Sequence, residues 1–394
     1  MKKVLISLLV LAVAGGGAFA QGWTFNGLVS GGLGMFFLED GDDDPYIRSM
    51  TWDGSGADFR TQLTARYANE DETAGFRFQI RSLNATDGTN PAAHFDFAYG
   101  WLNFMDDMIT VYGGRIFVGH FNALDRMHGW RHQATSQGLL TVLRPMDGLM
   151  LGFGAAAIGN SSVSEPPQAR FSFYARYDDP NGDFAFVFGI QNTNEHDLPD
   201  FEDFTAAQLE EWLESGPRQQ WSYAYVSFGW TADEDMHLAF TARFQALEEF
   251  SDFGRMYYYV TFGHTGLVEN MDLRAGASFG MSQSDAHEDF HLWIWGSVAY
   301  ELNERVIPRL DLHYVMGGRW AGPNLHHWMF RDGATFNSDD MFVQIRPAVQ
   351  LRATAASFLE IGCIFHIDLG DNGTFPGQSD GMNIGLYAMF RVSF

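Results

Sequence analysis

The sequence predicts an all-β protein, folded as a transmembrane antiparallel up-and-down β-barrel of the outer-membrane type. Three observations lead to this fold class. Segments of about ten residues alternate between apolar and polar side chains through most of the chain. The mean hydropathy is slightly polar, at −0.15, although 15% of the residues are aromatic. The N-terminus has the composition of a secretory signal.

Residues 1–20 are expected to form a cleaved signal peptide. Lys2 and Lys3 give a positive start, Val4–Ala14 is apolar, and Ala18–Ala20 has the small-x-small pattern of a cleavage site. The apolar run is too short for a spanning helix. We therefore expect a secreted chain whose mature part, residues 21–394, is a single barrel domain.

Individual strands follow from the period-two pattern. In one of them polar and apolar positions alternate, with Arg77, Gln79 and Arg81 on one face and Phe76, Phe78 and Ile80 on the other. In another, His94 and Asp96 are expected to face the lumen, opposite an outward row of Phe95, Phe97, Tyr99 and Trp101. If the first strand is Trp23–Leu38, the pattern gives about 18 strands. The count falls to about 16 if Gly138–Arg144 and Leu149–Ile158 are not separate strands.

Short and long connections also alternate. The short ones lie near Ala68–Thr73, Met105–Asp107, Met146–Gly148, Asp178–Asp183, Thr231–Asp235, Thr265–Asn270, Glu301–Arg305 and Ala353–Ala356. In outer-membrane barrels the short turns are periplasmic and the long loops extracellular. A barrel of about 18 strands is wide enough to hold an aqueous channel.

The end of the chain, Met382–Phe394, is a strictly alternating strand with a terminal aromatic residue. It resembles the C-terminal assembly signal of bacterial outer-membrane barrels, which carries apolar residues at every second position counted back from the end. The matching positions here include Leu386, Phe390, Val392 and Phe394. The resemblance implies a bacterial outer-membrane location, recognition by the barrel-assembly machinery and contact with outer-membrane lipids.

Arginines on the polar faces are the clearest functional candidates. The alternation places these in the lumen: Arg60, Arg66, Arg77, Arg81, Arg170, Arg176, Arg243, Arg274, Arg309, Arg346, Arg352 and Arg391. Fewer acids are expected there, namely Asp96, Asp272, Asp311, Glu360 and Asp368. Two interpretations stay open and are compatible: a network that solvates and stiffens the wall, and an electrostatic filter for solutes.

A segment after the fifth expected strand extends this pattern. Gly113–His120 ends that strand, and Phe121–Gln137 follows. Here the architecture resembles the general bacterial porins, in which the corresponding loop folds into the barrel and narrows the pore. The resemblance implies the constriction candidates Asp125, Arg126, His128, Arg131 and His132. Porins usually place carboxylates on this loop, whereas here it is mostly basic, and an ordinary extracellular loop is the alternative.

Two further resemblances concern assembly and source. Porin-like barrels are often trimers, so a homotrimer is compatible with the pattern, although no feature of the sequence demands one. The MKK start and the strands rich in Gly and Phe resemble spirochaete outer-membrane proteins.

Three other segments favour simple explanations. The acidic run Glu39–Asp44 lacks the spacing of an EF-hand and fits a solvated surface. Thr205–Ser215 has the pattern of a short capped helix, and the neighbouring His326 and His327 are weak evidence for a metal. Cys363, the single cysteine, excludes an intramolecular disulfide framework.

These observations favour an outer-membrane porin that forms a water-filled channel for small hydrophilic solutes, mildly preferring anions. The alternatives are a substrate-selective transporter, for example for fatty acids, and a surface adhesin. No catalytic motif is recognised, so we expect no enzyme, no cofactor and no bound metal. The formal net charge of −25 argues against nucleic acid as a partner, since phosphate binding needs a basic face.

Overall fold

The computed structural model describes residues 22–37, 46–50, 59–83, 92–116, 118–124, 137–158, 168–191, 221–231, 235–247, 253–282, 290–316, 341–369 and 382–393. Its elements are β1 (Trp23–Phe37), β2 (Tyr46–Met50), β3 (Phe59–Ala68), β4 (Ala74–Leu83), β5 (Ala92–Phe104), β6 (Ile109–Arg115), β7 (Gln137–Met146), β8 (Leu149–Ile158), β9 (Gln168–Asp178), β10 (Phe184–Gln191), β11 (Trp221–Thr231), β12 (Met236–Leu247), β13 (Phe253–His264), β14 (Met271–Ser282), β15 (Phe290–Tyr300), β16 (Val306–Met316), β17 (Met341–Thr354), β18 (Ser357–Asp368) and β19 (Met382–Ser393). In this part of the chain, no helix is long and apolar enough to cross a membrane.

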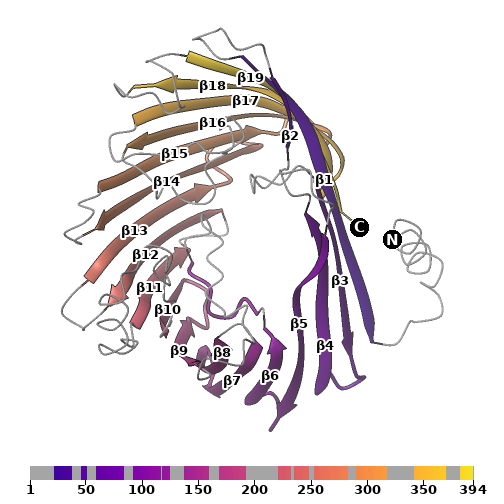
Figure 1. Cartoon of the computed structure of the whole chain (residues 1–394), viewed down its shortest axis with the longest axis vertical. Helices are drawn as coiled ribbons and strands as arrows, with labels where there is room; N and C mark the ends of the chain where they lie inside the picture. The colour runs from indigo at the N-terminus through magenta and orange to yellow at the C-terminus, as the bar shows by residue number, and fades with distance from the viewer. Residues whose placement is uncertain are drawn as a thin grey trace, which may run out of the picture.

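The strands form one closed antiparallel barrel (Figure 1). From β3 to β19 each strand pairs with the next one in sequence, and β19 closes the ring on β1, from Leu28 opposite Ser393 to Phe37 opposite Ile384. On its other side β1 pairs with β3 along one half and with β2 along the other. The 19 strands of the sheet therefore occupy 18 positions around the ring, because β2 and β3 share one. The predicted fold class and strand number are confirmed, and the two weakest predicted strands are β7 and β8.

One end of the barrel carries the short connections that the sequence predicts. Each joins two strands paired in the sheet, from β3 and β4 to β17 and β18. Left-handed backbone closes several of them: Met105, Asp106 and Asp107 have φ of 55°, 53° and 66°, and Gly148 has φ of 78°. Both ends of the ring, Trp23 of β1 and Ser393 of β19, lie at this end, as an even number of positions requires.

The outer face of the barrel is apolar. Large apolar side chains point outward at alternate positions and are well exposed, for example Phe76, Phe153, Phe171, Phe228, Phe240, Ile294, Leu312, Ile361, Leu386 and Phe390. In water so large an apolar surface would drive aggregation, whereas in a bilayer it faces the acyl chains. The alternation in the sequence predicts this belt directly.

The inner face is mixed in character. Polar side chains such as Gln344 and Arg346 of β17 are buried there, while the intervening Ile345 faces outward. Large aromatic residues also point inward, and several join a buried cluster with the segment after β6: Phe97, Tyr99, Tyr112, Phe121, Tyr174 and Tyr225. The lumen is therefore less uniformly polar than the period-two pattern alone suggests.

One predicted face is wrong, on β5. Gln79 of β4 pairs with Phe97 and the next residue, Ile80, pairs with Phe95, so Asp96 is an extra residue in a β-bulge. The bulge reverses the alternation beyond it. Phe95 remains outward with 54% exposure, but Phe97 is 1% exposed and faces the lumen. Tyr99 and Trp101, predicted to point outward, follow Phe97 onto the inner side.

Candidate functional site

The chain after β6 folds back against the inner wall. Residues 118–124 leave the end of β6 and run inside the ring towards β11, where the magenta segment lies within the circle of strands (Figure 1). Phe121 is fully buried and stacks on Tyr174 of β9, with ring centroids 5.1 Å apart. At Gly152 of β8, an added Cβ would lie 2.6 Å from the Phe121 ring, so this glycine makes the room that the ring fills.

Polar contacts fix the segment along its length. The hydroxyl of Tyr225 donates a hydrogen bond to the carbonyl oxygen of Phe121. The backbone N–H of Leu124 donates to Ser227 Oγ at 2.8 Å. Arg176 Nη1 donates to the carbonyl oxygen of His120 at 3.0 Å. Buried partners from β9 and β11 thus hold a non-regular backbone against the sheet, which satisfies groups that would otherwise lack water.

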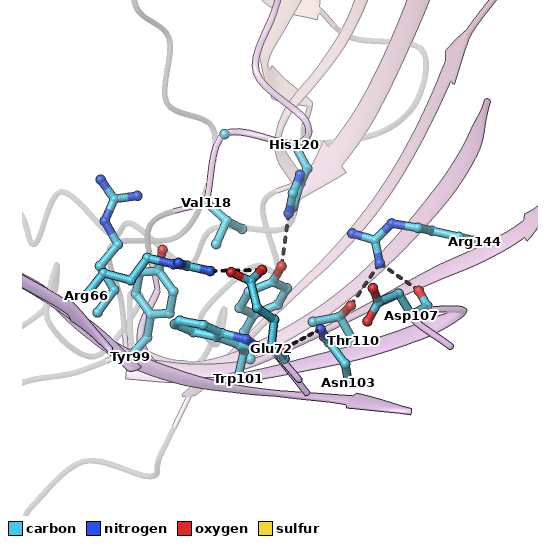
Figure 2. Close-up of a pocket in the computed structure, with 13 residues that line it drawn as sticks. Arg66, Glu72, Tyr99, Trp101, Asn103, Asp107, Thr110, Val118, His120 and Arg144 are labelled. Atoms are coloured by element: carbon cyan, nitrogen blue, oxygen red, sulfur yellow. Dashed lines mark hydrogen bonds and ion pairs between the residues drawn. The ribbon is translucent and has the colours of Figure 1, made fainter. Parts of the chain in front are cut away.

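Between this segment and the wall lies a cavity of about 520 Å³ (Figure 2). Five consecutive strands and two short turns form its floor and sides, and Val118, Gly119 and His120 cover it. The remaining lining residues are Arg66, Glu72, Arg77, Tyr99, Trp101, Asn103, Asp107, Thr110, Tyr112 and Arg144. Because Glu72 and Asp107 belong to turns of the short-turn end, the cavity lies towards that end of the barrel.

The three guanidinium groups that line the cavity outnumber its two carboxylates, those of Glu72 and Asp107, so one positive charge is in excess. Arg77 lies over the Phe97 ring, 5.2 Å from its centroid. Arg144 Nη1 donates to Thr110 Oγ1 at 2.8 Å and to the carbonyl oxygen of Asp107 at 3.1 Å. The ring under Arg77 and the two hydrogen-bond acceptors of Arg144 are electrically neutral, and the Asp107 carboxylate also lines the cavity. Arg66 forms an ion pair of 3.5 Å with Glu72 and lies over Trp101.

His120 is neutral at pH 7. Burial, followed by repulsion from the Arg144 and Arg176 guanidinium groups, lowers its pKa from 6.5 to about 4. Its Nε2 is 2.9 Å from the Tyr112 hydroxyl oxygen, so the uncharged ring hydrogen-bonds to the wall. The imidazole therefore adds a polar contact to the cavity but no charge.

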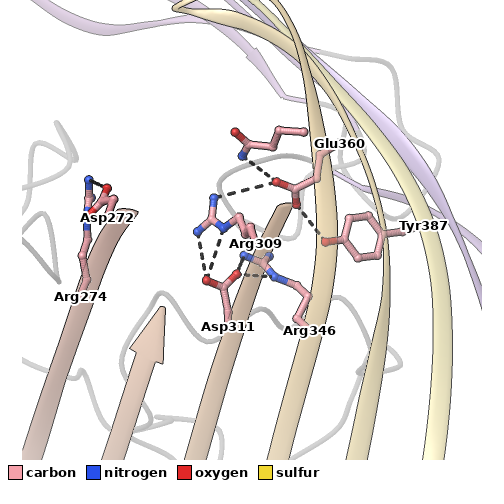
Figure 3. Close-up of polar contacts among 8 residues, drawn as sticks. Asp272, Arg274, Arg309, Asp311, Arg346, Glu360 and Tyr387 are labelled. Atoms are coloured by element: carbon pink, nitrogen blue, oxygen red, sulfur yellow. Dashed lines mark hydrogen bonds and ion pairs between the residues drawn. The ribbon is translucent and has the colours of Figure 1, made fainter. Parts of the chain in front are cut away.

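A second polar cluster lies on another part of the inner wall (Figure 3). Arg346 Nε donates to Asp311 Oδ2 at 2.8 Å, and Arg309 approaches both Asp311 and Glu360, at 3.2 and 3.9 Å. Glu360 also accepts hydrogen bonds from Gln350 at 2.7 Å and from the Tyr387 hydroxyl at 2.9 Å. This cluster joins four adjacent strands, β16 to β19, and its members are mostly buried.

The predicted wall arginines fall into distinct groups. Several pair with carboxylates: Arg66 with Glu72, Arg176 with Asp178, Arg274 with Asp272, Arg309 with Asp311 and Glu360, Arg346 with Asp311, and Arg352 with Glu301. Arg77, Arg81, Arg243 and Arg391 also lie on the inner side by strand parity, as do the predicted acids Asp272, Asp311, Glu360 and Asp368. The side chains of Arg60, Arg170 and Asp96 are outside the described part of the structure.

Other predicted features also lie outside the described residues. These are the constriction candidates Asp125, Arg126, His128, Arg131 and His132, the acidic run Glu39–Asp44, the expected helix Thr205–Ser215, the pair His326 and His327, the terminal Phe394 and the signal peptide. Among the described residues, no group of three or more His, Cys, Asp or Glu side chains could hold a metal ion.

Several residues of the cavity were not predicted from the sequence. Tyr99 and Trp101 were placed on the wrong face because of the bulge in β5. Arg144 was not predicted to face the lumen, because β7 carries apolar residues on both faces and the alternation along this strand is weak. A sharper signal for Arg144 is its position two residues after Val142, which is buried on the inner side.

Solved structures with the same fold were found by comparison. The anion-selective porin from Comamonas acidovorans superposes with a TM-score of 0.50 at 11% identity, over 94% of this chain and 99% of that one. OprD from Pseudomonas aeruginosa superposes with a TM-score of 0.51 at 9% identity, over 94% of this chain and 95% of that one. In fold, this chain resembles the general porins. At this level of identity the likeness shows architecture alone.

Comparisons of sequence add nothing to this likeness. No protein-family model matches the chain, and no curated protein matches it. The function is therefore inferred from the barrel and from the chemistry of its inner wall.

Proposed function

We propose that this protein is a non-enzymatic outer-membrane channel through which small hydrophilic solutes diffuse passively, with a mild preference for anions. The observation that carries the proposal is a closed barrel, apolar outside and lined inside by arginines, in which a segment folds against the wall. A barrel with 18 positions is wide enough for an aqueous lumen. The predicted secretory signal supports delivery of the chain to the outer membrane.

The anion preference follows from how the wall charges are paired. Arg274, Arg309 and Arg346 are offset by nearby carboxylates, so they contribute little net charge to a passing ion. Around the cavity, three arginines and two carboxylates leave one positive charge in excess. A charge close to the permeation path acts on an ion directly, whereas charges at the mouth are screened within about 10 Å at ordinary salt.

Planar-bilayer recordings test both parts of this proposal. The purified protein should give stepwise conductance, and in a salt gradient its reversal potential should show a mild preference for anions. The double change Arg77→Gln and Arg144→Gln should move the reversal potential towards cation preference. The matched control is Asp272→Asn with Arg274→Gln, which removes a pair of opposite charges from the wall. This control should leave the reversal potential unchanged. Absence of conductance would contradict the channel.

We also propose that β19 carries the assembly signal. Leu386, Phe390 and Val392 are exposed on the outer face of the strand that closes the ring on β1. Their spacing supports recognition by the barrel-assembly machinery before closure, since the same row is accessible before β19 pairs with β1. Changing Phe390 and Phe394 together to Asp should leave export intact and prevent insertion. Normal levels of the folded variant in the outer membrane would contradict this role.

A further inference from the structure

We propose that the cavity under residues 118–120 is a binding site for a small organic anion in which a carboxylate or a phosphate is attached to a flat ring. This inference rests on the proposed channel function and adds to it a site at which one class of solute binds during permeation. Four properties of the cavity support binding of such a solute: its size, its charge, its aromatic surface and the rigidity of its walls.

The size of the cavity suits a small organic molecule. Its volume of about 520 Å³ lies within the range of about 300–1,000 Å³ that is common for small-molecule sites. Strands β3 to β7 form the wall, and the segment fixed by Phe121, Tyr225 and Ser227 forms the cover. A solute in the cavity would therefore be enclosed on several sides rather than held against a flat wall.

The charge of the cavity favours an anion, because its three arginines exceed the two carboxylates of Glu72 and Asp107. Arg77 and Arg144 present guanidinium groups whose nearby partners are a ring, a hydroxyl and a carbonyl. Arg66 is paired with Glu72, but that carboxylate is 68% exposed and 3.5 Å away, and such exposed pairs are weak. A carboxylate or phosphate of a solute can replace Glu72 as the partner of Arg66 while it also reaches Arg77. Arg binds both groups through its planar fork.

The aromatic surface favours a ring on the same solute. Tyr99, Trp101 and Tyr112 come from adjacent strands and line one side of the cavity. In Figure 2 the ring of Trp101 lies beside Tyr99, below the Arg66 and Glu72 side chains. Flat rings stack on aromatic side chains and on guanidinium planes, with a gain beyond area burial alone. A ring-bearing anion therefore uses both surfaces, whereas a small inorganic anion uses only the charges.

The walls of the site are held in place without a ligand. Arg144 is fixed by Thr110 and the Asp107 carbonyl, and Tyr112 by His120. The Glu72 turn is also fixed, since Asn103 Nδ2 donates to the Glu72 carbonyl oxygen at 3.0 Å. Preorganised groups lose little entropy when a solute binds. The site therefore needs no rearrangement of the barrel.

Calorimetric titration of the purified protein in detergent tests this proposal. The probes are benzoate and phenyl phosphate. Two control compounds are benzamide, which has the ring but no charge, and acetate, which has the charge but no ring. At least one charged ring compound should bind about tenfold more tightly than benzamide and acetate. The comparison uses the unaltered protein, so it does not depend on the folding of a variant. Equal affinity for benzamide and benzoate, with no binding of phenyl phosphate, would overturn the proposal.

Variants assign the binding to this cavity. Two variants should each lower the affinity for the preferred probe at least about tenfold: the double change Arg77→Gln with Arg144→Gln, and the single change Trp101→Leu. Arg274→Gln removes an arginine from the inner side of β14 and should leave the affinity unchanged. If both cavity variants bind as well as the unaltered protein, the site lies elsewhere and the proposal fails.

The two titrations also separate the carboxylate from the phosphate. Preference for benzoate or for phenyl phosphate decides which oxyanion the three arginines fit better, and either preference supports the proposal. Binding without conductance would contradict the channel but leave the site standing. Conductance without binding of any probe would contradict the site alone.

Discussion

At the scale of single residues, the most consequential feature is a buried guanidinium group. Arg346 is only 2% exposed, and its nearest charged partner, Asp311, is buried beside it. Removing Arg346 leaves Asp311 with Arg309 alone, at 3.2 Å, in a place that water reaches poorly. Replacing both by apolar residues of similar size removes the two desolvation costs together.

We therefore expect Arg346→Met to lower the free energy of unfolding by less than about 3–5 kcal/mol, the usual cost of leaving one buried charge unpaired, because Arg309 still pairs with Asp311. Arg346→Met with Asp311→Leu should lose less than the single change. Urea-induced unfolding in detergent or lipid, followed by the loss of the folded band on an unheated gel, measures the difference. If the double variant is less stable than the single one, the pair contributes more than charge compensation.

His120 makes the docking of the inward segment dependent on pH. Its pKa is about 4 in the folded protein, against 6.5 for an unperturbed histidine. A released imidazole would therefore bind a proton at higher pH than the docked one. The docked state is favoured fully above about pH 6.5 and loses this advantage as the pH falls towards 4. Charging the ring would also place a third cation beside Arg144 and Arg176.

We expect acidification through this window to release residues 118–124 and to change the conductance reversibly. His120→Gln cannot gain the proton but keeps a side chain that can hydrogen-bond to the Tyr112 hydroxyl, so the acid response should shrink. Conductance recorded from pH 7 down to about pH 4, the folded pKa of His120, measures this. An unchanged response in His120→Gln would assign the effect to another group.

At the scale of elements, the inward segment depends on partners that lie far away in sequence. The Tyr225 hydroxyl of β11 donates to the carbonyl oxygen of Phe121, 104 residues earlier in the chain, and Ser227 Oγ accepts from the N–H of Leu124, 103 residues earlier. Removing the Tyr225 hydroxyl would leave a buried carbonyl without its donor, at a cost of about 1–3 kcal/mol. The Ser227 hydroxyl makes a comparable contact further along the segment.

Tyr225→Phe with Ser227→Ala should therefore loosen the segment and raise both the mean conductance and its noise. The matched control is Tyr387→Phe, which removes a buried tyrosine hydroxyl that donates to Glu360 on another part of the wall. Single-channel recordings compare the three proteins. Equal conductance and noise in the first variant and the control would show that these anchors do not hold the pore in shape.

The strands and their short connections can be predicted from the sequence, whereas the bulge in β5 and the docked segment after β6 cannot. Alternation and turn composition predict the strands and the short connections, because each depends on neighbouring residues. The bulge at Asp96 is hidden because Phe95, Phe97, Tyr99 and Trp101 are all aromatic, so the change of face leaves no trace in the pattern. The docking of Phe121 into the space at Gly152 is equally hidden, since it depends on tertiary contacts.

At the scale of the whole molecule, the charges are separated by region. The net charge is −25, yet arginines predominate over acids on the described inner wall. Many acids lie instead on the short turns, including Glu70, Asp71, Glu72, Asp106, Asp107, Asp147, Asp179, Asp183, Glu301 and Glu304. This rim attracts cations at low salt and is screened at high salt. The anion preference of the wall should therefore become clearer as the salt concentration rises.

The location of this acidic rim depends on the orientation of the barrel, which labelling can determine. Short turns of outer-membrane barrels are periplasmic, so Asn181, exposed in the turn between β9 and β10, should be shielded in intact cells. With Cys363→Ser as background, Asn181→Cys should react with a membrane-impermeant thiol reagent only after the outer membrane is permeabilised. Asp43→Cys, between β1 and β2, should react in intact cells. Equal labelling at both positions in intact cells would contradict the orientation, and labelling of Asn181→Cys alone would place the acidic rim and the cavity at the cell surface.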